Sequence, residues 1–141
     1  MKFTGIVTAI VFACITVLCG TAQTVEPPKH IGDKLKANPM DSIRILWIGN
    51  SYTYFNDLPQ MVEDMGKRNG VSISTSRILK GGESLAGHLT NPELYKQIRR
   101  GDWDYVVIQE FSSTPAYSTR YVAENILPYA AEIDSLVKIL T

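Results

Sequence analysis

The sequence predicts a mixed α/β fold built on a parallel sheet. Three short apolar segments rich in β-branched residues occur along the chain, and stretches with helical periodicity separate them. Each apolar segment ends abruptly at glycine or polar residues, which is typical of buried strands. Crossovers of this length require parallel strands and right-handed connections. The repeated order of strand and helix therefore indicates a doubly wound sheet with helices on both faces.

The first strand and helix are predicted around the segment Gly49-Asn50-Ser51. Residues 43–48 form the strand, and this segment ends it. Asn56 or Asp57 can cap the helix that follows, with Pro59 in its first turn. Four apolar side chains recur at helical spacing before Asn69-Gly70 ends the helix: Leu58, Met61, Val62 and Met65.

Two further strands and two further helices complete the pattern. Residues 71–79 are predicted to form the second strand, and Gly81-Gly82 ends it. A short helix is then predicted to begin at Asn91-Pro92 and to reach residue 100. Residues 104–109 are the third strand. Residues 121–140 are helical in pattern, and Pro128 should kink that helix or split it.

The predicted architecture is a flavodoxin-like, three-layer α/β/α parallel sheet. Such sheets commonly hold about five strands, whereas only three are predicted before Thr141. The last residues, 137–140, are mostly apolar and need a surface to pack against. We therefore expect a sheet truncated after about three strands, as in the front half of a longer protein.

The amino-terminal residues have the layout of a secretory signal peptide. Lys2 precedes an apolar stretch at 6–18, which is short for a membrane span. Small residues then lead to Ala22, after which we expect cleavage. Residues 23–40 are polar and proline-rich and predict a linker. The domain should occupy 41–141, in a secreted or periplasmic protein.

Composition excludes several classes of function. Formal net charge is zero, and without a basic patch we expect no nucleic-acid partner.

The two cysteines, Cys14 and Cys19, lie inside the signal segment. A lipoprotein is the weaker alternative there, because Leu18 is bulky for a lipobox and Cys14 comes early. A mature chain without cysteine has neither disulfides nor a thiolate metal site. We predict no cofactor, and the sequence gives no oligomeric state.

Polar clusters follow all three predicted strands. The first contains Ser51, the second Gly81-Gly82 and the third Gln109-Glu110. Because parallel strands end at one edge of a sheet, these clusters should converge there. Ser51 is either a nucleophile beside backbone N–H groups or a residue that caps the turn. Gln109 could donate to an oxyanion. Glu110 could orient a base or bind a sugar hydroxyl, or lie in a solvated loop.

Other polar residues have simpler interpretations. Ser84 lies in a near-elbow pattern and is a rival nucleophile, but we expect it to cap a turn or helix. His88 could be a base for Ser51, although a surface or partly buried structural role is favoured. Asp102 and Asp104 precede the third strand and should cap it and face solvent. The acidic pair Glu63-Asp64 predicts a helix face that is exposed to solvent.

At its strand ends the chain resembles the SGNH (GDSL-like) hydrolase superfamily, and within it a secreted bacterial subgroup with an SGNH-type domain of unknown function. Residues 48–51, Ile-Gly-Asn-Ser, correspond to the first motif, with Asn50 where most members have Asp. Ser51 matches the nucleophile. Gly81 or Gly82 matches the oxyanion glycine of the second motif, and Gln109 stands where the third motif has Asn.

This resemblance implies a serine ester hydrolase that forms an acyl-enzyme at Ser51. The oxyanion hole would comprise Ser51, Gly81, Gly82 and Gln109, and Asn50, Tyr52 and Glu110 are candidates for binding substrate. The substrate would be a carbohydrate or small acyl ester. The family's late Asp-x-x-His, which supplies the base, does not occur in this sequence. We therefore expect the chain alone to be weakly active or inactive.

Two other interpretations stay open. Residues 49–53 also resemble the phosphate-binding loop of flavodoxin-like proteins, which predicts a non-catalytic module for an anion or glycan. The third interpretation is an incomplete gene product without function.

Overall fold

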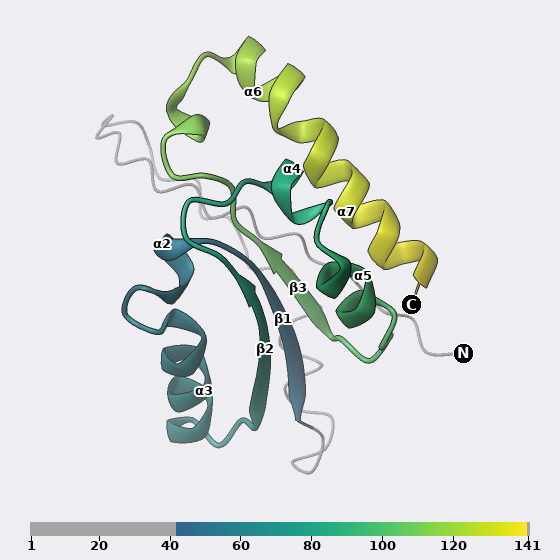
Figure 1. The fold of residues 1–141 in the computed structure, drawn as a ribbon. Coiled ribbons are helices and arrows are strands. Elements are labelled where there is room, and N and C mark those ends of the chain that lie inside the picture. Colours follow the sequence, from purple (N-terminus) through teal and green to yellow (C-terminus); the bar gives the residue numbers. More distant parts are fainter. Residues whose placement is uncertain (1–41, 141) are drawn as a thin grey trace, which may run out of the picture.

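A computed structural model describes residues 42–140 (Figure 1). The signal peptide and linker predicted before them lie outside the described residues. The elements run in the order β1 (Ile43–Gly49), α2 (Ser51–Tyr54), α3 (Leu58–Arg68), β2 (Ile73–Leu79), α4 (Leu85–His88), α5 (Pro92–Ile98), β3 (Tyr105–Ile108), η1 (Thr114–Ala116), α6 (Thr119–Asn125) and α7 (Leu127–Leu140). All three predicted strands are present, each within two residues of its predicted bounds.

The strands form one open sheet in the order β2-β1-β3. Both pairings of the central strand are parallel, with Ile43 opposite Ile73 and Ile45 opposite Tyr105. The predicted parallel sheet and helical crossovers are therefore confirmed. All three strands also end at the same edge, which places the loops after β1, β2 and β3 together.

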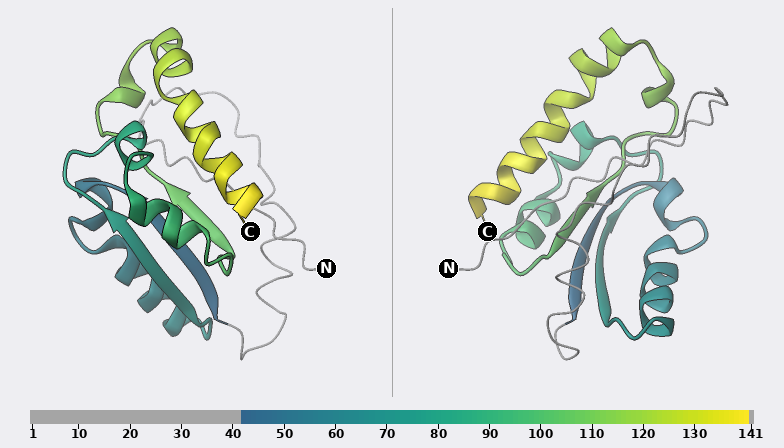
Figure 2. Two further views of the ribbon diagram at one scale, coloured as in Figure 1. Left: turned by 45° about the vertical axis from the view of Figure 1, so that its right-hand side comes forward. Right: turned by 180° about the vertical axis from the view of Figure 1, so that it is seen from behind.

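Helices cover both faces of the sheet (Figures 1 and 2). α3 lies on one face, and α4, α5 and α7 lie on the other. Successive side chains of a strand point to opposite faces, so Leu46 and Ile48 of β1 enter the core beneath α5 and α7. That core contains Leu46, Ile48, Ile78, Leu85, Leu94, Ile98, Trp103, Val106, Ile108, Ile133 and Val137. No helix in the described residues is long and apolar enough to cross a bilayer.

Helix α3 has the predicted start but packs through an unexpected face. Asp57 caps it with positive φ (51°), and Pro59 lies in the first turn. Gly66 faces β2 so closely that a Cβ there would lie 2.7 Å from Cδ1 of Ile73. The apolar side chains Leu58, Met61 and Met65 are exposed instead. A small residue thus determines which side of the helix meets the sheet.

The prediction of a solvated helix face at 63–64 is wrong for Glu63. Its carboxylate accepts hydrogen bonds from the backbone N–H of Thr75 (2.8 Å) and from the Thr75 hydroxyl (2.6 Å). Thr75 lies on β2, an outer strand of the sheet. Glu63 therefore satisfies a backbone donor of that outer strand. Asp64 is exposed, as predicted.

The predicted helix at 121–140 is split, as Pro128 suggested. α6 ends at Asn125, Ile126 interrupts it, and Pro128 occupies the second position of α7. Proline is tolerated there because the first N–H groups of a helix have no intrahelical partner. Pro128 therefore marks the start of the second helix. The short helix α4 was predicted only through Ser84, which we expected to cap a turn or helix.

Asp102 and Asp104 do not simply face solvent, so that prediction is corrected. Oδ2 of Asp104 accepts the backbone N–H of Arg44 at 2.9 Å. Oδ2 of Asp102 pairs with the guanidinium groups of Arg44 at 2.8 Å and Arg100 at 3.5 Å. Both carboxylates thus tie the segment before β3 to the start of β1, which the linear sequence could not reveal.

Candidate active site

Asn50 joins the three loops that meet at the carboxyl edge of the sheet. It follows β1 directly and is only 1% exposed. Its side-chain amide nitrogen donates to the carbonyl of Glu83 (2.9 Å), after β2, and to that of Glu110 (3.2 Å), after β3. Its side-chain oxygen accepts the N–H of Tyr52 (3.2 Å) and caps α2. Both amide hydrogens of Asn50 are therefore used within the fold.

Ser51 is the first residue of α2 and is half-buried. Among the described residues, neither its hydroxyl nor its backbone N–H has a hydrogen-bond partner. The next three N–H groups, by contrast, all bind Asn50: that of Tyr52 through the side chain, and those of Thr53 (3.0 Å) and Tyr54 (3.3 Å) through the carbonyl. The loop therefore leaves Ser51 as its free polar residue.

The turn at Gly81-Gly82 lies beside α2. Gly82 has positive φ (68°), which favours glycine, and a Cβ there would meet nothing within 4 Å. A Cβ on Gly81 would lie 2.8 Å from the hydroxyl oxygen of Tyr54. Both glycines are exposed, and neither N–H is bonded within the described residues. The turn thus presents free backbone donors next to the helix that begins with Ser51.

Gln109 lies between the first and third loops. Its side-chain oxygen accepts the N–H of Asn50 (3.0 Å) and the hydroxyl of Thr53 (2.9 Å). Its side-chain nitrogen donates to the carbonyl of Glu110, which leaves one amide hydrogen. These side chains crowd Gly49, where a Cβ would lie 2.8 Å from Oγ1 of Thr53 and 2.9 Å from Oε1 of Gln109. The predicted role of Gln109 in an oxyanion hole stays a prediction.

Glu110 connects the third loop to the second. Its Oε2 accepts the N–H of Leu85 at 3.2 Å, at the start of α4, and its Oε1 accepts the N–H of Phe111 at 2.6 Å. The carboxylate therefore holds backbone donors. Whether it also binds a substrate hydroxyl or orients a base stays a prediction.

Ser84 caps α4, as predicted, because its hydroxyl oxygen accepts the N–H of Gly87 at 3.1 Å. The neighbouring Glu83 pairs with the ammonium of Lys80 at 2.6 Å. This hydrogen bond holds the pKa of the Glu83 carboxyl below its ordinary value; desolvation opposes the shift and the N–H of Ser84 supports it. Glu83 is therefore a carboxylate at neutral pH.

His88 is more deeply buried than predicted, at 1% exposed. Its Nε2 lies 2.8 Å from the carbonyl oxygen of Gly49, and its Nδ1 has no hydrogen-bond partner. No hydrogen bond links it to Ser51 among the described residues. The hydrogen bond of its ring is thus with the residue at the end of β1.

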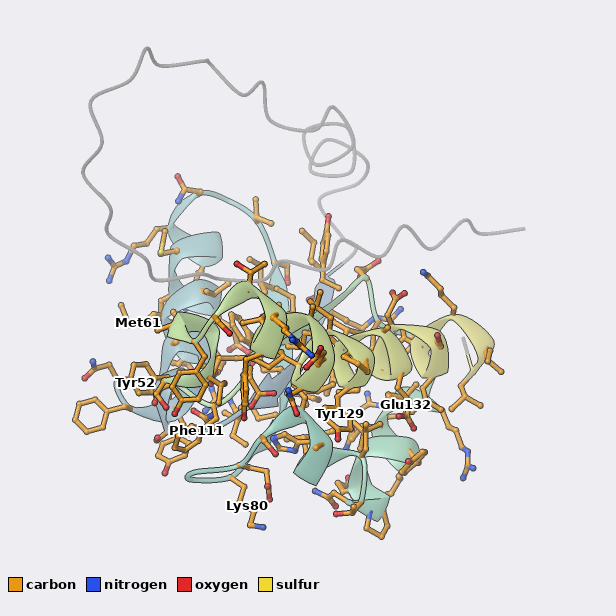
Figure 3. All side chains as sticks on the ribbon, turned by 90° about the horizontal axis from the view of Figure 1, so that it is seen from above. Tyr52, Met61, Lys80, Phe111, Tyr129 and Glu132 are labelled. Atoms are coloured by element: carbon orange, nitrogen blue, oxygen red, sulfur yellow. The ribbon has the colours of Figure 1, made fainter. Side chains whose placement is uncertain are left out.

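The surface around this edge is aromatic. Tyr52 is 69% exposed, and Tyr54, Phe55, Phe111 and Tyr117 are also exposed. In the view onto the edge, Tyr52 and Lys80 project outward from the ribbon (Figure 3). Within residues 42–140 no group of three His, Asp or Glu side chains is placed to hold a metal ion. Comparison of the chain with family models, curated proteins and solved structures finds no match.

The structure thus brings the three predicted clusters to one edge and adds two residues. Thr53 and Gly49 belong to the predicted loop but were not predicted as site residues, yet both lie against Gln109. The position of Thr53, two residues after Ser51, did not by itself indicate a contact with Gln109. The requirement for glycine at 49 appears only when the side chain of Gln109 is placed against it.

Proposed function

We propose that this chain is a secreted serine ester hydrolase of the SGNH type, with Ser51 as its nucleophile. The observation that supports this most is the contrast at the carboxyl edge. Asn50, Thr53 and Gln109 are bonded within the fold, whereas the Ser51 hydroxyl has no partner among the described residues. Open α/β sheets bind their ligands at this edge.

Backbone donors near Ser51 suit the charge that develops in acyl transfer. Attack of the hydroxyl on an ester carbonyl gives a tetrahedral oxyanion, which two or three N–H groups would stabilise. The unbonded N–H groups of Ser51, Gly81 and Gly82 are the candidates. The remaining amide hydrogen of Gln109 is a further one. The proposed fold around them is the doubly wound, flavodoxin-like sheet.

The base is the part this sequence does not supply. It contains no Asp-x-x-His, and Nε2 of His88 is occupied by the Gly49 carbonyl. A serine without its base keeps only the contributions of the oxyanion hole and of binding. We therefore expect slow reaction at Ser51 in this chain. Exposed aromatic side chains such as Tyr52 suit the acyl or sugar part of a small ester.

An anion-binding module is the less supported alternative. A phosphate-binding loop directs several backbone N–H groups at its ligand. Here the N–H groups of Tyr52, Thr53 and Tyr54 bind Asn50, so the loop retains only that of Ser51. Glu83 and Glu110 add negative charge to the neighbouring loops. This arrangement favours the hydrolase over a phosphate carrier.

Labelling with a fluorophosphonate probe tests the nucleophile. The probe forms a covalent bond with a nucleophilic serine, slowly where the base is missing, and mass spectrometry locates it. We expect adducts at Ser51, loss of labelling in Ser51→Ala, and retention in Ser84→Ala, which removes the rival hydroxyl. Labelling at Ser84, or equal labelling of Ser51→Ala and the unmodified chain, would refute the proposal.

Chemical rescue tests the missing base. Imidazole added to the solution can accept the hydroxyl proton that no side chain takes. We expect imidazole to increase the hydrolysis of an aryl acetate by the unmodified chain more than tenfold, after subtraction of the rate with Ser51→Ala. That subtraction removes hydrolysis by imidazole itself. No difference between the two proteins would contradict a nucleophilic Ser51.

A further inference from the structure

We infer that His88 is a positioning residue for Ser51, acting through the carbonyl of Gly49. This inference builds on the proposed function, since it concerns the same nucleophile. His88 lies on α4, and Gly49 ends β1, 39 residues earlier in the chain. The bond between them crosses from the second loop to the turn that carries Ser51.

The peptide group between Gly49 and Asn50 is held at both of its polar atoms. Its carbonyl oxygen lies 2.8 Å from Nε2 of His88 and also accepts the N–H of Lys80 at 3.1 Å. Its N–H donates to the side-chain oxygen of Gln109 at 3.0 Å. Three bonds from separate segments therefore fix the plane of this peptide. Ser51 follows one residue later, so the same plane sets the direction of the turn.

A side chain on residue 49 could not hold this peptide group in place. A Cβ there would meet Thr53 and Gln109 at under 3 Å. The turn must therefore be fixed from other segments. His88 is well suited, because both polar atoms of its own backbone are bonded. The N–H of His88 binds the carbonyl of Ser84 at 3.0 Å, and that of Asn91 binds the carbonyl of His88 at 3.0 Å.

The contact also determines which ring nitrogen of His88 carries the proton. A carbonyl oxygen only accepts, so Nε2 must donate. In the neutral ring Nδ1 is then unprotonated, and it has no hydrogen-bond partner. A base for Ser51 would have to present a free nitrogen to that hydroxyl. Nε2 of His88 is bound to Gly49, and among the described residues no hydrogen bond links Nδ1 to Ser51, which separates the positioning role from catalysis by proton transfer.

Two variants distinguish the roles. His88→Gln places an amide N–H near the position of Nε2, so it can donate to Gly49 without being a base. His88→Leu keeps the volume and loses the donor. We expect fluorophosphonate labelling of Ser51 to stay within about threefold in His88→Gln and to fall about 10–100-fold in His88→Leu. The dependence of labelling on pH should be the same in His88→Gln and the unmodified chain.

Two measurements do not depend on reaction at Ser51. Nitrogen NMR of the unmodified chain should show the Nε2–H tautomer. Hydrogen exchange of the Asn50 amide should be faster in His88→Leu than in His88→Gln, with an unchanged circular dichroism spectrum in both. An Nδ1–H tautomer, or equal exchange and labelling in both variants, would overturn the inference. Absence of serine labelling in the unmodified chain, with exchange as expected, would instead count against the proposed hydrolase.

Discussion

The side-chain oxygen of Gln109 accepts the backbone N–H of Asn50 at 3.0 Å. This bond joins the end of β3 to the residue before the proposed nucleophile, 59 positions apart in the chain. Asn50 makes a second bond to the same loop through its side-chain amide, which donates to the carbonyl of Glu110 at 3.2 Å. Asn50 therefore donates twice to the third loop, once from its backbone and once from its side chain.

Replacing Asn50 by Asp should destabilise the fold, although the resembled family mostly has Asp at this position. The carboxylate cannot donate to the carbonyls of Glu83 and Glu110, and it would be buried against them. We expect a loss of about 2–4 kcal/mol in free energy of unfolding at pH 7, measured by urea denaturation. A protonated Asp regains one donor, so the loss should shrink at pH 4. Unchanged stability at pH 7 would contradict the bonding described for Asn50.

Gly49→Ala tests the crowding beneath the turn. The added Cβ would lie 2.8 Å from Oγ1 of Thr53 and 3.1 Å from Cβ of Gln109. We expect a cost of about 1–3 kcal/mol from overpacking, measured by thermal or urea unfolding. Gly82→Ala is the matched control, because space is open there and only its positive φ (68°) opposes a side chain. Unchanged stability of Gly49→Ala would show that residue 49 is not crowded.

The bond between Thr53 and Gln109 can be measured with a double-mutant cycle. The Thr53 hydroxyl is buried and donates to Gln109 at 2.9 Å. We expect Thr53→Val to cost about 1 kcal/mol and the cycle with Gln109→Leu to give a coupling of about 0.5–1.5 kcal/mol. Thr90→Val is the control, because the Thr90 hydroxyl donates to Gly87 at an exposed site. A coupling of zero would mean that the bond does not stabilise the fold.

Lys80→Met should weaken the protein at neutral pH and have a smaller effect in acid. Lys80 holds the pKa of Glu83 below its ordinary value of 4.5. A carboxyl with a lowered folded-state pKa stabilises the fold above its unfolded pKa, and this contribution disappears as pH falls through the folded pKa. Lys80 is exposed, so the difference at pH 7 should be only a few tenths of a kcal/mol.

Urea denaturation at pH 7 and at pH 3 measures this effect, and the difference between the two proteins should be smaller at pH 3. Lys96→Met removes a pair of the same spacing on α5, where Lys96 lies 3.3 Å from Glu93. There the main cause of the lowered Glu93 pKa is Gln97 instead, so this control should show a smaller dependence on pH. A difference that grows toward pH 3 would reverse the sign expected for Glu83.

The sequence by itself determined where the strands lie and that their ends meet. Runs such as residues 43–48 and 104–109 are apolar and β-branched, and glycine or polar residues stop them. This information is local, since hydrophobic periodicity and turn residues act over a few positions. The effects of Pro59 and Pro128 on their helices could also be predicted from the sequence, because proline restricts the backbone of its own turn whatever surrounds it.

Only the tertiary structure decided what the polar residues at that edge do. Asn50 reaches carbonyls 33 and 60 positions away, and His88 meets Gly49 across 39. No local pattern marks such contacts, because one backbone carbonyl resembles any other until the chain folds. Glu63 was misjudged for the same reason: a charge on an amphipathic helix looks solvated until a strand donor, here Thr75, is placed against it. Burial requires each polar group to find a partner, and only the folded chain specifies which one is within reach.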